Sequence, residues 1–210
     1  VSIVTLYNNM LIGFSLNGSD NLITSIQEDL NLYGFNISGS GNVIKNITSD
    51  NNNVLGLYIK GNYNKISYFY VENAGQDGII INGDYNNLNN VLAENNIYYE
   101  VNNGINITGD YNKVTNAYIE NFLLAGINIT GNKNLIINVT SSNNSYAFNI
   151  TGNNNILYEV KAIHNGYGFN IIGNQDIVND SEAKINDYGL YSKGDGLVVR
   201  NITFIDGGVY

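Results

Sequence analysis

The segment Gly126-Ile127-Asn128-Ile129-Thr130-Gly131-Asn132-Lys133-Asn134-Leu135-Ile136 contains the unit from which most of this 210-residue chain is built. Its two glycines lie five positions apart, and nine units show this spacing, with the first glycine replaced once, by Ala147. Successive units begin 21, 22, 22, 26, 22, 21, 21 and 21 residues apart. A fixed period in this range is typical of a solenoid. The nine pairs are Gly13/Gly18, Gly34/Gly39, Gly56/Gly61, Gly78/Gly83, Gly104/Gly109, Gly126/Gly131, Ala147/Gly152, Gly168/Gly173 and Gly189/Gly194.

Apolar and polar residues alternate between the two glycines. In the quoted unit, Ile127 and Ile129 are apolar, whereas Asn128 and Thr130 are polar. Such alternation over four or five residues predicts a half-buried strand. We expect the second glycine, Gly131, to end the strand, because the bend that follows needs freedom in φ.

An asparagine stands three positions after the second glycine in seven of the units. Asparagine tolerates a left-handed backbone and can bond to its own turn. Asparagine amides stacked in register also bond to one another along the stack. We therefore expect a structural ladder, with Asn132 outside it. The members of this ladder are Asn21, Asn42, Asn64, Asn86, Asn112, Asn134 and Asn155.

Two apolar residues separated by three positions follow the ladder asparagine, for example Ile44 and Ile47. This spacing predicts a strand, a bend and a second strand, and no part of the repeat predicts a helix. An all-strand repeat of this length predicts an all-β fold, a single-stranded parallel β-helix of about nine coils. Each strand then pairs with its copy one coil away, at about 4.8 Å. The absence of proline fits, because nearly every backbone N–H is needed for pairing.

The unit G-Φ-x-Φ-x-G-x-x-N-x-Φ, in which Φ is a large apolar residue, resembles the right-handed parallel β-helix repeats of the pectate-lyase-like superfamily. The resemblance extends over residues 13–205 and implies a right-handed coil. It implies no single activity, because that superfamily includes polysaccharide lyases, hydrolases, viral tailspikes and adhesins. Its lyases use a basic residue as proton abstractor, but the only arginine here, Arg200, lies in the last coil. The only histidine, His164, takes the place that Asn143 has one coil earlier, and we expect it to substitute for an asparagine.

Composition and charge exclude several classes of function. The formal net charge of −9 argues against a nucleic-acid partner, which needs a basic face. The chain has no cysteine for a disulfide or a thiolate metal site, and no apolar run long enough to span a bilayer. We expect one β-helix domain over residues 1–210, with 1–12 as a partial first coil or cap, 13–205 as repeats and 206–210 as the C-terminal end. The first residues resemble no signal peptide and include no initiator Met, so we expect a processed product or a segment of a longer protein.

An acidic residue lies sixteen positions after the leading glycine in five consecutive repeats: Asp29, Asp50, Glu72, Glu94 and Glu120. Stacking in register would place neighbouring carboxylates about 5 Å apart. Three roles stay open: a solvated face, contact with a glycan or a cation such as calcium, and catalysis by paired carboxylates. We predict no catalytic residue, no metal site and no cofactor, with calcium as the one candidate ion. Of this row, Glu72, Glu94 and Glu120 are the predicted binding residues.

Tyrosines recur at two positions of the repeat, where they either stack on a sugar or partner side chain or stiffen a corner. The first row consists of Tyr63, Tyr85 and Tyr111, and the second of Tyr146, Tyr167 and Tyr188. The first row supplies further binding candidates. The 26-residue repeat adds about four residues near 96–103, and insertions in solenoids map to one face, often the binding face. Two binding candidates fall there, Tyr98 and Tyr99.

Ten Asn-x-Ser/Thr sequons are candidates for glycosylation of an extracellular protein. An Asn- and Thr-rich strand also produces this motif by alternation alone, so both interpretations stay open. The sequon asparagines are Asn17, Asn36, Asn46, Asn106, Asn128, Asn138, Asn143, Asn149, Asn179 and Asn201.

Together these features predict an extracellular structural or adhesive β-helix of a cell-surface or virion appendage such as a fibre or spike. Its expected partners are glycans or copies of itself, in a filament or a trimer. The alternative is a carbohydrate-active enzyme, a polysaccharide lyase or glycoside hydrolase, or its inactive relative. A compact catalytic cluster in a groove would favour the enzyme, whereas rows that continue from coil to coil favour the rod.

Overall fold

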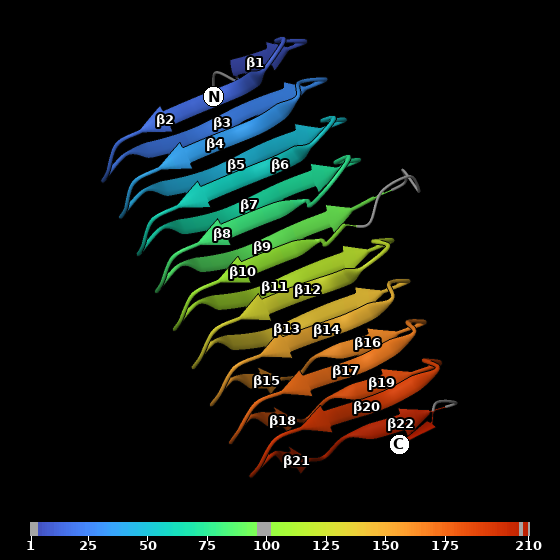
Figure 1. The fold of residues 1–210 in the computed structure, drawn as a ribbon. Helices are drawn as coiled ribbons and strands as arrows, with labels where there is room; N and C mark the ends of the chain where they lie inside the picture. The colour runs from blue at the N-terminus through green and yellow to red at the C-terminus, as the bar shows by residue number, and fades with distance from the viewer. Residues whose placement is uncertain (1–3, 96–101, 206–207, 210) are drawn as a thin grey trace.

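The computed structural model describes residues 4–95, 102–205 and 208–209, and within these ranges the chain is built from strands and turns without a helix. Figure 1 shows the strands stacked as successive rungs, with the two termini at opposite ends of the stack. The fold is the predicted parallel β-solenoid of about nine coils. The described residues contain no helix that could cross a membrane.

Two parallel sheets form the walls of the solenoid. The ten-stranded sheet contains nine strands at the paired glycines and a short tenth strand, β23 (Gly208–Val209), after the last pair. The nine are β2 (Ile12–Asn17), β4 (Tyr33–Ser38), β6 (Leu55–Lys60), β8 (Ile79–Asn82), β10 (Ile105–Thr108), β12 (Ala125–Thr130), β14 (Tyr146–Thr151), β17 (Tyr167–Ile172) and β20 (Tyr188–Lys193). The thirteen-stranded sheet contains β1 (Val4–Tyr7), β3 (Leu22–Asp29), β5 (Val43–Asp50), β7 (Lys65–Glu72), β9 (Asn87–Glu94), β11 (Lys113–Glu120), β13 (Leu135–Ser142), β15 (Ile156–Tyr158), β16 (Lys161–Ile163), β18 (Ile177–Asn179), β19 (Glu182–Lys184), β21 (Val198–Arg200) and β22 (Thr203–Ile205).

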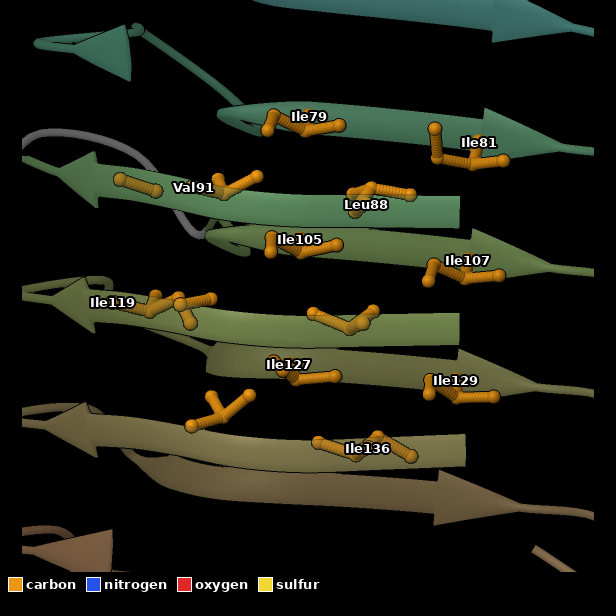
Figure 2. Close-up of a cluster of buried hydrophobic side chains, with 14 of the residues drawn as sticks. Ile79, Ile81, Leu88, Val91, Ile105, Ile107, Ile119, Ile127, Ile129 and Ile136 are labelled. Atoms are coloured by element: carbon orange, nitrogen blue, oxygen red, sulfur yellow. The ribbon is translucent and has the colours of Figure 1, made fainter. Parts of the chain in front are cut away.

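The core is a column between the two sheets in which like residues stack on like. Ile79, Ile105 and Ile127 occupy the same place in β8, β10 and β12, and all three side chains are fully buried. Figure 2 shows Ile79 and Ile105 on the rungs next to Leu88 and Val91 of the opposite sheet, with Ile127 one rung further on. The strands between the glycines are therefore half-buried, as the alternation predicted: their apolar residues face inward and their polar residues face outward.

A left-handed residue bends the longer strands of the thirteen-stranded sheet. In β5 this residue is Asn46, with φ 55°, and it lies between the buried Ile44 and Ile47. Side chains three positions apart on a regular strand point to opposite faces. The left-handed residue changes the direction of the chain, so both isoleucines reach the core. This is the bend that the spacing of three predicted.

The asparagines expected to form a ladder are joined by hydrogen bonds between coils. Asn134 Oδ1 accepts the backbone N–H of Asn112 (2.8 Å), and Asn134 Nδ2 donates to Asn155 Oδ1 (3.1 Å) and to the carbonyl oxygen of Gly109 (3.1 Å). The row ends on Asp176, whose Oδ1 accepts the backbone N–H of Asn155 (2.7 Å). These contacts pair buried polar groups of the turn that would otherwise be left without a partner.

Asn132 lies outside this ladder, as expected, but it belongs to a second row of its own. Its backbone N–H and Nδ2 both donate to Asp110 Oδ1, at 2.7 and 3.1 Å, and its own Oδ1 accepts from the N–H and Nδ2 of Asn153. A side row thus accompanies the main ladder. This side row is hard to recognise in the sequence because Asp, Asn and Ser all occur at its repeat position.

A further buried row follows the thirteen-stranded sheet and was also missed. Asn31 donates its backbone N–H to Asn52 Oδ1 (3.2 Å), and the same contact links Asn144 to Asn165 (3.0 Å) and Asn165 to Asn186 (2.8 Å). Its sequence signal is an asparagine eighteen positions after the leading glycine. Ala74 and Phe122 replace asparagine at this position in middle coils, which obscures the signal.

Asn134→Ala should destabilise the protein by about 1–3 kcal/mol, because it removes the side-chain partner of the Asn112 backbone N–H and of the Gly109 carbonyl oxygen on the preceding coil. Chemical denaturation would measure the change. Thr151→Ala is the control, since Thr151 is exposed and lies at the end of β14. Equal losses in the two variants would contradict the cooperative ladder.

Candidate functional site

All variation in repeat length falls at one corner of the solenoid. The leading glycine, the ladder asparagine and the position of the acidic row keep constant spacing. The distance in sequence from the acidic-row position to the leading position of the next unit varies. It is five residues from Ser142, six from Glu120 and ten from Glu94. We call this connection, which leads from the thirteen-stranded sheet into the ten-stranded one, the variable corner. Length variation in a solenoid often marks its binding face.

A groove of about 700 Å³ lies against this corner, on the outer side of the ten-stranded sheet. Its size is within the range of small-ligand sites. Four coils contribute to it, each through the turn before a strand or through the strand itself. The groove is lined by Tyr33, Val54, Leu55, Tyr58, Gln76, Asp77, Ile80 and Asn103.

The groove combines aromatic surface with fixed polar groups. Tyr33 is 37% exposed, and the hydroxyl of Tyr58 accepts a hydrogen bond from Asn82 Nδ2 (3.2 Å). Asp77 Oδ1 accepts the backbone N–H of Asn103 (2.6 Å) and its Nδ2 (2.9 Å), while Asp77 Oδ2 accepts from Asn106 Nδ2 (2.8 Å). The carboxylate is therefore held in one orientation. Aromatic rings with a few oriented acceptors suit a ligand that has both apolar faces and hydroxyl groups.

A second hollow of about 680 Å³ lies further along the same corner. Leu123, Tyr146, His164 and Tyr167 are among its lining residues. His164 is exposed and has the same left-handed backbone as Asn143 one coil earlier, with φ values of 56° for both. The histidine thus occupies the expected place in the row, and it also faces a hollow that the sequence did not indicate.

The acidic row is in register along the thirteen-stranded sheet. Asp50 pairs with Glu72, Glu72 with Glu94, and Glu94 with Glu120. Burial, and then the charges of Glu72 and Glu120, raise the pKa of Glu94. No three acidic, histidine or cysteine side chains among the described residues lie close enough to hold a metal ion. No residue of the row lines either hollow.

Joint replacement of Glu72, Glu94 and Glu120 by Gln should preserve the fold and raise the melting temperature slightly at low salt. The reason is that stacked like charges repel and are screened by added salt. Differential scanning fluorimetry with and without calcium would measure the effect. If the parent, but not the triple variant, gained stability from calcium, the row would be a cation site and not a solvated face.

The first tyrosine row is stacked upon itself. The ring centroids of Tyr63 and Tyr85 lie 4.9 Å apart, and those of Tyr85 and Tyr111 4.7 Å apart, with nearly parallel planes. Lys133 continues the row, with Nζ 5.0 Å from the Tyr111 ring centroid. The faces of Tyr85 are covered on both sides, so this row fits a stiffened corner better than a sugar platform. The proposed binding residues Tyr98 and Tyr99 lie outside the described residues.

The sequons fall into two structural settings. The sequon residues Asn106, Asn128 and Asn149 form an amide row along the outer side of the ten-stranded sheet, which Asn170, not a sequon, continues, with Nδ2 to Oδ1 distances of 3.0, 2.7 and 2.6 Å. A glycan on one of these amides would crowd the next coil. The remaining sequon asparagines are partly or fully exposed: Asn17, Asn36, Asn46, Asn138, Asn143, Asn179 and Asn201. Glycosylation of any of them stays a prediction.

These features define the class of protein: the chain is a right-handed parallel β-helix with a groove at its variable corner. The A-module of the mannuronan C-5 epimerase AlgE4 from Azotobacter vinelandii is similar in structure, with TM-score 0.65, 8% identity, and coverage of 97% of this chain and 75% of that one. The A-module of AlgE6 from the same organism has TM-score 0.50 and 10% identity, with coverage of 97% and 72%. At these identities the likeness establishes the fold alone. No protein-family profile and no curated protein sequence matches the chain.

Proposed function

We propose that the protein is an extracellular carbohydrate-binding β-helix, and that its groove at the variable corner holds a neutral segment of a glycan. The observation that carries this proposal is the groove itself, with Tyr33 and Tyr58 beside the oriented carboxylate of Asp77. Sugar rings present apolar C–H faces to aromatic side chains and hydroxyl donors to carboxylates. The similarity of the fold to the A-modules of mannuronan epimerases is consistent with this class of ligand.

The electrostatics favour a neutral glycan over one that contains uronates. The chain carries a formal charge of −9, and Asp77 is the charged group among the groove residues that the structure describes. A uronate placed there would meet a carboxylate with no cation beside it. Like charges in a partly desolvated site disfavour binding.

The number of carboxyl groups in the groove, and the hydrogen bonds they accept, favour binding over catalysis. Glycoside hydrolysis ordinarily uses a pair of carboxyl groups, one on each side of the scissile bond. Among the described lining residues, Asp77 is the single carboxyl, and both of its oxygens already accept hydrogen bonds from asparagines. The enzyme alternative therefore lacks a recognisable acid–base pair here, although turnover of a bound glycan remains an outcome that the experiment below would detect.

A screen of the purified protein against an array of neutral and uronate-containing oligosaccharides would test the proposal, followed by titration calorimetry. We expect neutral oligosaccharides to bind, and Tyr58→Ala to weaken binding at least about tenfold, roughly 1.4 kcal/mol. Tyr58→Phe should retain most of the affinity because the ring remains. Tyr85→Ala is the matched control, since it removes a ring outside the groove whose faces are already covered.

Three results would contradict the proposal. Binding that is unchanged in Tyr58→Ala but lost in Tyr85→Ala would move the site to the tyrosine row. Reproducible cleavage of an array oligosaccharide would favour the enzyme. Failure of every glycan to bind, together with concentration-dependent assembly in analytical ultracentrifugation, would favour the structural rod whose partners are copies of itself.

A further inference from the structure

Glu28 is an acid in a row of the core that otherwise holds small or apolar residues. It is fully buried and faces inward from β3. The stacked positions in the following coils are Ser49, Val71, Ala93, Ile119, Ser141, Ala162 and Ala183. The equivalent serine in a later coil, Ser141, forms the same contacts with an asparagine and a carbonyl oxygen that Ser49 forms. Glu28 is therefore a departure from the repeat that the core itself does not require.

Three polar side chains enclose the carboxyl group. Asn31 Nδ2 donates to Glu28 Oε2 (2.7 Å), Asn52 Nδ2 donates to Glu28 Oε1 (2.7 Å), and Ser49 Oγ is also bonded to Oε1. The backbone of Gly34 completes the chamber, because a Cβ atom at Gly34 would overlap Oε1. Glu28 thus has no exposed surface in the folded state.

The groups that face Glu28 are neutral. They are Leu6 from β1, Gly34 from β4 and Ser49 from β5, together with Asn31 and Asn52 from the two turns. The charged neighbour is Asp29 on its own strand, which is also an acid. Burial raises the pKa of Glu28 to about 7, although its hydrogen bonds act in the opposite direction. No cation among these neighbours compensates the ionised form, so ionisation inside the chamber is costly.

The chamber is continuous with one wall of the groove. Asn31 and Asn52 belong to the turns that present Tyr33 and Val54, and the backbone of Asn31 accepts the N–H of Asn53 (2.9 Å). The carbonyl oxygen of Val54 in turn accepts the N–H of Gln76 (2.7 Å). The side-chain bonds to Glu28 therefore fix two turns that both contribute lining residues.

We propose that Glu28 is a positioning residue of the groove and makes its wall sensitive to pH: the neutral carboxyl group holds turns 30–33 and 51–54 in place, and its ionisation loosens them. The coupling to ligand binding rests on the carbohydrate-binding function proposed above. The effect of Glu28 on the two turns is independent of that function. Because the charged carboxylate can be solvated only if a turn opens, local opening becomes more frequent as pH rises.

Hydrogen exchange with mass spectrometry tests the effect on the turns directly. The parent, Glu28→Gln and a control, Glu159→Gln, which removes an exposed acid distant in sequence, would be compared at pH 6 and pH 8. Relative to Glu28→Gln at the same pH, the parent should gain about tenfold in opening of turns 30–33 and 51–54 over this range. Glu159→Gln should behave as the parent does. Glu28→Ser, which restores the residue of the later coils, provides a second variant should Gln fail to fold.

An affinity measurement extends the test to the groove. With the neutral oligosaccharide selected on the array, the parent should bind more weakly at pH 8 than at pH 6, and Glu28→Gln should show a flat profile. Equal exchange of the two turns in the parent and in Glu28→Gln at both pH values would overturn the proposal. If no oligosaccharide binds, the proposed function fails, and the exchange result still decides the role of Glu28.

Discussion

Gly131→Val should lower the melting temperature far more than Thr130→Val. Gly131 has φ 155°, a backbone that residues with a side chain rarely adopt, and a Cβ atom there would overlap the carbonyl oxygen of Gly109 in the coil before. The backbone strain is worth about 1–3 kcal/mol, and the overlap adds a further penalty of similar size. Thermal unfolding followed by circular dichroism would measure both variants.

Thr130 is the matched control because it is the neighbouring residue and faces outward. It is exposed and stacks on Thr108 and Thr151 along the sheet. Valine is a good strand former on such a surface, so the melting temperature should change little. If both variants melted together, the assignment of Gly131 to the obligatory bend at the strand end would be wrong.

Glu28→Gln should stabilise the protein at pH 8 and leave it nearly unchanged below pH 4.5. The folded-state pKa of Glu28 is about 7, above the ordinary 4.5, so the folded protein binds this proton more tightly than the unfolded chain. The stability that the proton confers is complete below pH 4.5 and is lost as pH rises towards 7. A difference of this size corresponds to about 3 kcal/mol.

Urea denaturation at pH 4, 6 and 8 would measure this effect. The informative quantity is the difference in unfolding free energy between the parent and Glu28→Gln, because other carboxyl groups contribute equally to both. The difference should grow across pH 4.5–7 and then level off. A parent that is more stable than Glu28→Gln at pH 8 would mean that the ionised carboxylate is well accommodated by its asparagine and serine partners.

The architecture could be predicted from the sequence because nine repeats show the same spacing of glycine, apolar and polar residues. The glycine pair locates every strand of the ten-stranded sheet except β23, and the spacing of three between Ile44 and Ile47 marks the bend at Asn46. Each copy alone would be a weak signal. Their agreement is strong, since stacking in register requires equivalent residues to occupy equivalent places.

The groove could not be predicted in the same way, because it is made of departures from the repeat. Tyr33, Asp77 and Asn103 share one repeat position, just before or at the start of a strand, yet they differ chemically. Only the structure shows that they line a hollow. Glu28 is hard to recognise for a related reason, because it directly precedes Asp29 of the acidic row. A charged residue in a row of alanine, serine and valine was the available signal.

The variable corner has a consequence for how such a protein diversifies. Connections of five, six or ten residues join strands that keep the same register with the neighbouring coils. A longer connection therefore leaves the ladders and the core column unchanged. The surface at this corner can therefore change without a change in the interactions that stabilise the fold. New recognition loops can be grafted at this edge one coil at a time, and several unlike surfaces can follow one another along a single rod.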